Sequence, residues 1–251
     1  MSVLEKLLLE ISKNEEEGFD YDKASEWIAK EFILNSSLIV SESEYSFAEI
    51  EIYTRNGFHD DPFVHSNQYK NVCRQYEFGE WYFHRFNSID KYTHRMRGLD
   101  LTFGNKDLQF SGGILIRGIK SLSDGKIIQG PSNVVGEIKS QLEKLDSEYS
   151  LEYLAKSIGR FAFNAKSPLR IEENGRGISK LLRVKRFGLS EKKEDVGNKY
   201  FNKAYRFIAK DVEYIKTLKD RYKVVIELLN NEQIEKADSV EILGYNSNFS
   251  K

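Results

Sequence analysis

The chain of 251 residues contains a single cysteine, Cys73, and only three prolines. One cysteine excludes an intramolecular disulfide and a cysteine zinc cluster, and it fits a reducing compartment. No run of about eighteen apolar residues occurs, so the sequence predicts no membrane-spanning helix. The apolar stretch from Val3 to Ile11 is interrupted by three charged residues, which excludes a signal-peptide pattern there. We therefore expect a cytoplasmic protein without a membrane partner.

Apolar residues make up 40% of the chain and charged residues 31%, a balance typical of one ordered domain, or of one domain with an appendage. The net charge of −1 hides an asymmetry. Residues 1–60 carry five basic and fourteen acidic side chains, whereas residues 156–210 carry fifteen basic and five acidic ones. The basic segment would suit contact with phosphates, or it could neutralise the acidic half across an interface. A pI near 6.5 counts against a large DNA footprint.

Hydrophobic periodicity predicts alternating groups of strands and helices. Helices are expected at Val3–Lys13, Asp22–Phe32, from Pro131 onward, and at 150–160. Strands are expected at 38–40, 47–53, 80–86, 99–103, 114–119, 169–172, 181–186 and 204–208, whereas 212–229 could be helical or could contain a strand at 224–226. In the second helix, Ala24, Trp27, Ile28 and Phe32 are predicted to face inward. This order of elements predicts an α+β domain around a curved antiparallel sheet.

Two of these strands carry charged residues that could meet. In the strand Phe47–Tyr53, Ala48, Ile50 and Ile52 alternate with Glu49, Glu51 and Tyr53. The apolar run Gly112–Ile119 contains one arginine, Arg117. A buried arginine needs an acidic partner, so a Glu–Arg pair that holds a water is one interpretation. A half-buried strand with a solvated glutamate face, and an arginine at the sheet edge, is the other.

Several short motifs occur in an order that resembles the alkyladenine (3-methyladenine) DNA glycosylase family over roughly residues 20–210. The motifs are Ala24–Phe32, Glu49–Tyr53, His65–Ser66, Gly98–Thr102, Gly113–Arg117, Gly130–Ser132, Arg183–Leu189 and Lys203–Phe207. The resemblance implies a single domain around a curved, mostly antiparallel sheet with flanking helices. It divides the chain into an N-terminal helix (1–19), a glycosylase-like domain (20–210) and a C-terminal extension (211–251).

The resemblance also implies roles for individual residues. Glu51 matches the general base that orients a water, and Arg117 matches the arginine that helps to hold that water. Tyr53 and His65 match residues that stack on a base flipped out of the duplex. Asp100 stands where the family usually has an asparagine that senses the purine edge. Glu49 lies on the same strand face as Glu51, but the family pattern places the base two residues before the tyrosine.

The chemistry is consistent with these roles. Breaking an N-glycosidic bond develops positive charge on the sugar, which a nearby carboxylate stabilises while it accepts the proton of the attacking water. One general base suffices when the leaving base is already cationic, as in N-alkylated purines. A neutral leaving base also needs an acid.

The segments that would handle DNA depart from the family pattern. The hairpin that normally wedges an aromatic side chain into the duplex is replaced by 87–97, where Tyr92, Met96 or neither would take that part. Backbone phosphates are expected to meet basic residues after 169, above all Arg183, Lys185 and Arg186. The acidic loop with His59 and His65 looks like a metal site, but the resemblance implies no metal, so we expect neither metal nor cofactor.

Three functions remain open from the sequence. The first is a monomeric, monofunctional DNA glycosylase whose partner is double-stranded DNA with a modified base. The second is an N-glycosidase for free modified nucleosides or nucleotides, which the near-neutral pI and the altered hairpin favour. The third is a binding protein for such molecules, against which Glu51 and Arg117 argue because a binder needs no water-activating pair.

Overall fold

The longest strand, β2 (Ser43–Arg55), runs through the middle of the sheet and holds much of the candidate site. Along one edge it pairs with β5 (Ser111–Ser121). Along the other edge Ser43 to Ser46 pair with β1 (Ser36–Val40), and Glu49 to Glu51 pair with β9 (Arg206–Ala209). Since β2 has neighbours on both edges, its backbone polar groups are paired and its inward side chains are buried.

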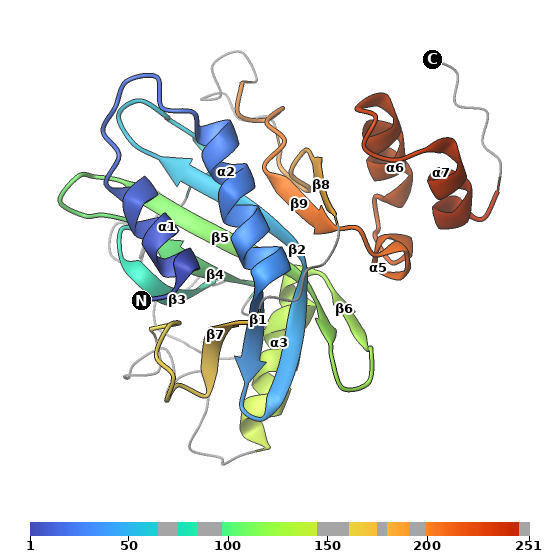
Figure 1. Cartoon of the computed structure of the whole chain (residues 1–251), viewed down its shortest axis with the longest axis horizontal. Helices are drawn as coiled ribbons and strands as arrows, with labels where there is room; N and C mark the ends of the chain where they lie inside the picture. The colour runs from blue at the N-terminus through green and yellow to red at the C-terminus, as the bar shows by residue number, and fades with distance from the viewer. Residues whose placement is uncertain (65–74, 85–96, 145–160, 175–179, 191–198, 246–251) are drawn as a thin grey trace.

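The structure is a computed structural model that describes residues 1–64, 75–84, 97–144, 161–174, 180–190 and 199–245. Within these ranges the sheet has the order β3-β4-β5-β2-β1-β7, with β6 beside β5 and β8 beside β9. The remaining strands are β3 (Phe78–His84), β4 (Gly98–Phe103), β6 (Ile127–Gln129), β7 (Leu169–Glu173) and β8 (Leu181–Val184). Every pairing is antiparallel. The expected α+β domain around a curled antiparallel sheet with flanking helices is confirmed (Figure 1).

The helices flank this sheet (Figure 1). They are α1 (Val3–Ser12), α2 (Tyr21–Ala29), which continues as the π-helix η1 (Lys30–Leu34), α3 (Pro131–Glu143), α5 (Val212–Lys216), α6 (Arg221–Asn230) and α7 (Lys236–Leu243). None of the helices described here is both long and apolar enough to cross a bilayer. The helix expected at 150–160 lies outside the described residues.

The prediction that Trp27 faces inward is wrong. Its side chain is 47% exposed. The buried residues of α2 are Tyr21, Ala24, Ser25, Ile28 and Ala29, a stripe with spacings of three and four. Trp27 lies off this stripe. It follows Ser25 by two residues, which is about half a helical turn, so its side chain points away from the buried face.

The simple alternation in β2 also fails at one position. The pairing register of β2 with β5 shifts on both sides of Glu49, which leaves Ala48 without a partner on β5. Ala48 packs among the C-terminal helices, whereas Phe47, Ile50 and Ile52 belong to the main core with α1 and α2. A bulge of this kind inserts one extra residue and bends the strand.

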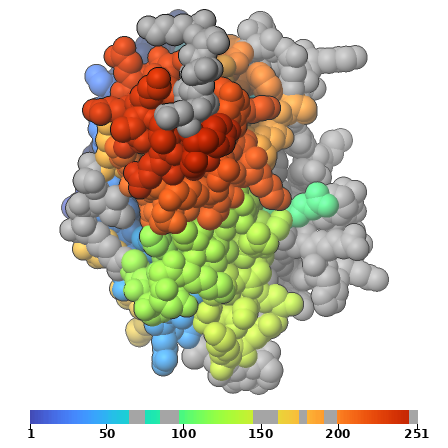
Figure 2. Space-filling model, turned by 90° about the vertical axis from the view of Figure 1, so that its right-hand side faces the viewer, coloured from blue at the N-terminus to red at the C-terminus, as the bar shows by residue number. Residues whose placement is uncertain are grey.

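The C-terminal segment is part of the fold. Tyr214, Ile215, Val225 and Leu228 share a buried cluster with Ala48 and with apolar residues of β8 and β9. Figure 2 shows the segment, coloured red, as a continuous mass beside the green part of the chain. The ambiguity at 212–229 is resolved in favour of helices, α5 and α6. The C-terminal helices therefore bury one end of the sheet.

Candidate functional site

Glu51 is completely buried on β2 and accepts hydrogen bonds from three donors. Its Oε1 accepts from the backbone N–H of Phe187 at 2.6 Å. Its Oε2 accepts from the Tyr53 hydroxyl at 2.7 Å and from Arg117 Nη1 at 3.3 Å. A carboxylate has about four lone-pair positions, so three donors fix its orientation and leave capacity for a water.

Arg117 lies between two carboxylates. Its Nε is 2.6 Å from Glu49 Oε1, and its Nη1 reaches Glu51. Burial opposes the charge of Arg117, but the charges of Glu51 and Glu49 outweigh it and raise the pKa of the guanidinium. The expected approach of Glu51 and Arg117 is therefore confirmed, although the shorter contact is with Glu49.

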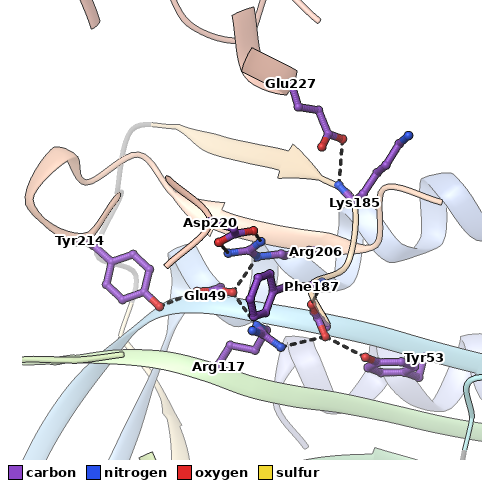
Figure 3. Close-up of polar contacts among 10 residues, drawn as sticks. Glu49, Tyr53, Arg117, Lys185, Phe187, Arg206, Tyr214, Asp220 and Glu227 are labelled. Atoms are coloured by element: carbon purple, nitrogen blue, oxygen red, sulfur yellow. Dashed lines mark hydrogen bonds and ion pairs between the residues drawn. The ribbon is translucent and has the colours of Figure 1, made fainter. Parts of the chain in front are cut away.

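Glu49 is enclosed by a second set of partners (Figure 3). Arg206 Nε lies 2.7 Å from Glu49 Oε1, and the Tyr214 hydroxyl donates to Oε2 at 2.6 Å. Arg206 in turn forms an ion pair with Asp220 at 2.5 Å. Glu49, Arg206 and Tyr214 form a buried cluster, with the partly exposed Asp220 at its edge, and Glu49 is a structural acceptor within it. The carboxylate available to a ligand is Glu51.

A cavity of about 280 Å³ opens beside the Glu51 carboxylate. Its walls are Glu51, Tyr53, Phe63, Gln75, His84, Leu115, Arg117 and residues Phe187 to Ser190. The volume is close to the lower end of typical ligand pockets, about 300–1,000 Å³, so it suits one small ring system. The ring of Phe187 lies 5.2 Å from the Arg117 guanidinium and is 37% exposed, so it is the wall's most accessible aromatic side chain among those described.

Tyr53 contributes its hydroxyl to the site. Burial and the nearby charge of Glu51 raise its pKa well above the ordinary value, so the hydroxyl stays protonated and donates. The Arg186 guanidinium lies 4.7 Å from the centre of the ring. If Tyr53 stacks on a base, as the resemblance implies, its ring would contact both that base and the Arg186 guanidinium.

Asp100 lies one layer behind the cavity wall and is fully buried. Its Oδ2 accepts a hydrogen bond from Gln75 Nε2 at 2.7 Å and lies 2.8 Å from His84 Nε2. Gly113 permits this arrangement, because a Cβ there would approach Gln75 Nε2 to 2.7 Å. Asp100 itself does not line the cavity, whereas its neighbours Gln75 and His84 do. The expectation that Asp100 touches the edge of a bound purine therefore does not match its position.

Arg186 does not lie on the surface expected for a phosphate contact. Its side chain has no exposed area, forms an ion pair with Asp61 at 2.6 Å and donates to the Tyr200 carbonyl. Burial opposes its charge, yet the charge of Asp61 raises its pKa above the ordinary value. A guanidinium held in this way has a structural role, so the expectation that Arg186 contacts DNA does not match its position.

The other two basic residues differ from each other. Arg183 donates to the Ala204 carbonyl at 2.7 Å and lies 3.5 Å from Asp22, whereas Lys185 is exposed and bonds Asn202 at 3.0 Å.

His65 and Tyr92 lie outside the described residues. Within the described ranges, no three histidine, cysteine, aspartate or glutamate side chains are placed to hold a metal ion.

Sequence reasoning missed Arg206, Tyr214, Asp220 and Phe187. Arg206 carried a usable signal, because it is a second lone arginine in an apolar strand. Tyr214 and Asp220 had none, since only the packing of the C-terminal helices brings Tyr214 to Glu49 and Asp220 to Arg206.

No family model matches the chain. It is similar to uncharacterized protein L759 of Acanthamoeba polyphaga mimivirus, with 31% identity over 117 residues. The match covers 42% of this chain and 52% of that protein, so the chain spans about half the length of the relative. The name of that protein states no activity, and function has to be argued from the site.

Proposed function

We propose that the protein is a monofunctional DNA glycosylase that hydrolyses the N-glycosidic bond of a modified base. The observation that carries the proposal is the Glu51 carboxylate, held by Tyr53, Arg117 and the Phe187 N–H at the wall of a base-sized cavity. The extruded base would occupy the cavity, and a water beside Glu51 would attack C1′.

Three features of the site support hydrolysis over simple binding. Arg117 and the Phe187 N–H donate to the carboxylate and hold its orientation, as a general base requires. The buried negative charge would also stabilise positive charge on the sugar. The cluster of Glu49, Arg206 and Tyr214 fixes Arg117 from behind, which limits reorganisation during the reaction.

The proposed partner is double-stranded DNA that carries a modified base, bound by a cytoplasmic monomer that needs no cofactor. Lys185 is an exposed cation two residues before Phe187, so a phosphate contact there would lie close in sequence to the cavity wall. The buried position of Arg186 favours a second candidate, an N-glycosidase for free modified nucleosides or nucleotides, because it removes one expected phosphate contact.

The experiment is to incubate the protein with duplex oligonucleotides that contain alkylated, deaminated or otherwise modified bases, and to cleave any abasic sites with alkali. The same modified bases are supplied in parallel as free nucleosides, with release followed by chromatography. Strand cleavage supports the glycosylase, and release from nucleosides alone supports the second candidate. Absence of release from both panels would refute hydrolysis at this site.

A further inference from the structure

The short segment that follows β8 links the C-terminal helices to the candidate site. The Lys185 N–H donates to Glu227 Oε1 on α6 at 2.9 Å (Figure 3). Two residues later, the Phe187 N–H donates to Glu51 Oε1 on β2 at 2.6 Å. One short stretch of backbone is therefore held at its start by a carboxylate of the C-terminal helices and at its end by the carboxylate of the site.

The C-terminal segment also covers the outer edge of β8, whose inner edge pairs with β9. The side-chain amide of Gln233 accepts from the Arg183 N–H at 2.6 Å and donates to the Arg183 carbonyl at 2.7 Å. Backbone groups two residues apart point to the same edge of a strand, so the Lys185 N–H continues the row that Arg183 begins. Gln233 and Glu227 thus take the place of a neighbouring strand along an edge that would otherwise be open.

The side chain of Phe187 ties the same segment to the arginines of the site. Its ring centre lies 5.2 Å from the guanidinium carbon of Arg117 and 5.6 Å from that of Arg206. Both arginines are ion-paired with Glu49 and buried, so their positions are fixed. A displacement of Phe187 would therefore weaken two cation–π contacts and its N–H bond to Glu51 together.

We infer that Glu227 is a positioning residue, which acts through Lys185 and Phe187 to hold the Glu51 carboxylate in the orientation that activates water. This inference rests on the proposed function and gives the C-terminal helices, which lie beyond residues 20–210, a part in the reaction. Glu227 is not among the residues that line the cavity, so its effect on a ligand has to pass through the backbone segment.

The first test is the rate of base release in single-turnover reactions on the best substrate of the panel. We expect Glu227→Leu to lower the rate constant by about 10- to 10²-fold, because a displacement of roughly 1 Å at a reacting group has effects of that order. Glu227→Gln should recover most of the loss, since its amide oxygen still accepts the Lys185 N–H. The amide carries no charge, so this recovery would also exclude a purely electrostatic effect.

The matched control is Glu241→Leu, because Glu241 is an exposed glutamate on the neighbouring helix α7. It should leave the rate of base release unchanged. Equal rates in Glu227→Leu and in this control would overturn the inference.

A double-mutant cycle separates the positioning of Glu51 from a general loss of structure. In a Glu51→Gln background, Glu227→Leu should lower the rate little further, because the group that it positions is already gone. A general structural defect would lower the rate by the same factor in both backgrounds. Equal factors would therefore refute the positioning role.

Amide hydrogen exchange at Phe187 is a measurement that needs no substrate. The Phe187 N–H should exchange about two- to tenfold faster in Glu227→Leu than in the control, a factor that corresponds to the net free energy of one hydrogen bond. Gln233→Leu, which removes both bonds to Arg183, should act in the same direction and replaces Glu227→Leu if that variant does not fold. Unchanged exchange in a folded variant would refute the inference and leave the role of Glu51 intact. If the unmodified protein releases no base of the panel, the proposed function fails and the positioning role fails with it.

Discussion

The hydroxyl of Tyr214 on α5 donates to Glu49 Oε2 on β2 at 2.6 Å, although 165 residues separate them in the sequence. Glu49 Oε1 in turn accepts from Arg117, the arginine that contacts Glu51. The C-terminal helices are thus joined to the candidate site by two successive buried hydrogen bonds.

Replacement of Tyr214 by Phe should destabilise the protein by about 1–3 kcal/mol, because the Glu49 carboxylate loses a buried donor. The free energy of unfolding in urea measures this. Tyr245→Phe is the matched control, since Tyr245 is 54% exposed and should change stability by less than about 0.5 kcal/mol. Equal effects of the two substitutions would contradict a stabilising Tyr214–Glu49 bond.

Glu51→Gln should reduce base release by roughly 10²–10⁴-fold, since the amide keeps the shape but cannot accept the proton of water. Single-turnover kinetics on the best substrate of the panel measure the loss. Glu42→Gln, at the exposed turn between β1 and β2, is the control for the loss of one negative charge. An unchanged rate in Glu51→Gln would remove Glu51 from the mechanism.

Arg186→Met should destabilise the protein by about 3–5 kcal/mol, because it leaves the Asp61 carboxylate buried without its cation. The double variant Asp61→Asn with Arg186→Met should recover part of this loss, since no unpaired charge remains. Lys185→Met is the matched control on an exposed neighbouring cation. Chemical denaturation of the unmodified protein, of Asp61→Asn and Arg186→Met singly, and of the double variant tests the coupling, which strictly additive losses would disprove.

Lys185→Ala should reduce the salt dependence of duplex binding. If Lys185 neutralises one phosphate, the slope of log affinity against log salt becomes shallower by about 0.9. Fluorescence anisotropy over a range of salt concentrations measures the slope. Lys6→Ala is the control, because Lys6 is an exposed residue of α1, which packs in the main core and contributes no residue to the described cavity wall. A slope equal to that of the unmodified protein would exclude a phosphate contact at Lys185.

His59 should make the protein less stable in mild acid. Burial, and then the charges of Lys203 and Lys199, lower its pKa from the ordinary 6.5 to about 3. The unfolded chain therefore binds the proton more readily than the folded one, so stability is full above pH 6.5 and falls as the pH drops from 6.5 toward 3. His59→Gln should show a weaker dependence of unfolding free energy on pH in this window. Identical slopes in urea titrations at several pH values would refute the assignment.

The sequence by itself determined the features that depend on local periodicity. Alternation along Phe47–Tyr53 placed Glu51 and Tyr53 on one face of a strand, and the lone arginine of Gly112–Ile119 required an acidic partner. The observed contact of Arg117 with Glu51 follows from these two local facts once β2 and β5 are paired. The α+β class followed in the same way from the order of elements.

The tertiary structure alone decided which charged group does what. The bulge at Ala48, the burial of Arg186 against Asp61, and the enclosure of Glu49 by Arg206 and Tyr214 all depend on segments far apart in the chain. A charged side chain looks the same in a sequence whether its partner is water, a phosphate or a buried carboxylate. Its role is set by desolvation and by the nearest opposite charge, and both arise only when the distant elements pack together.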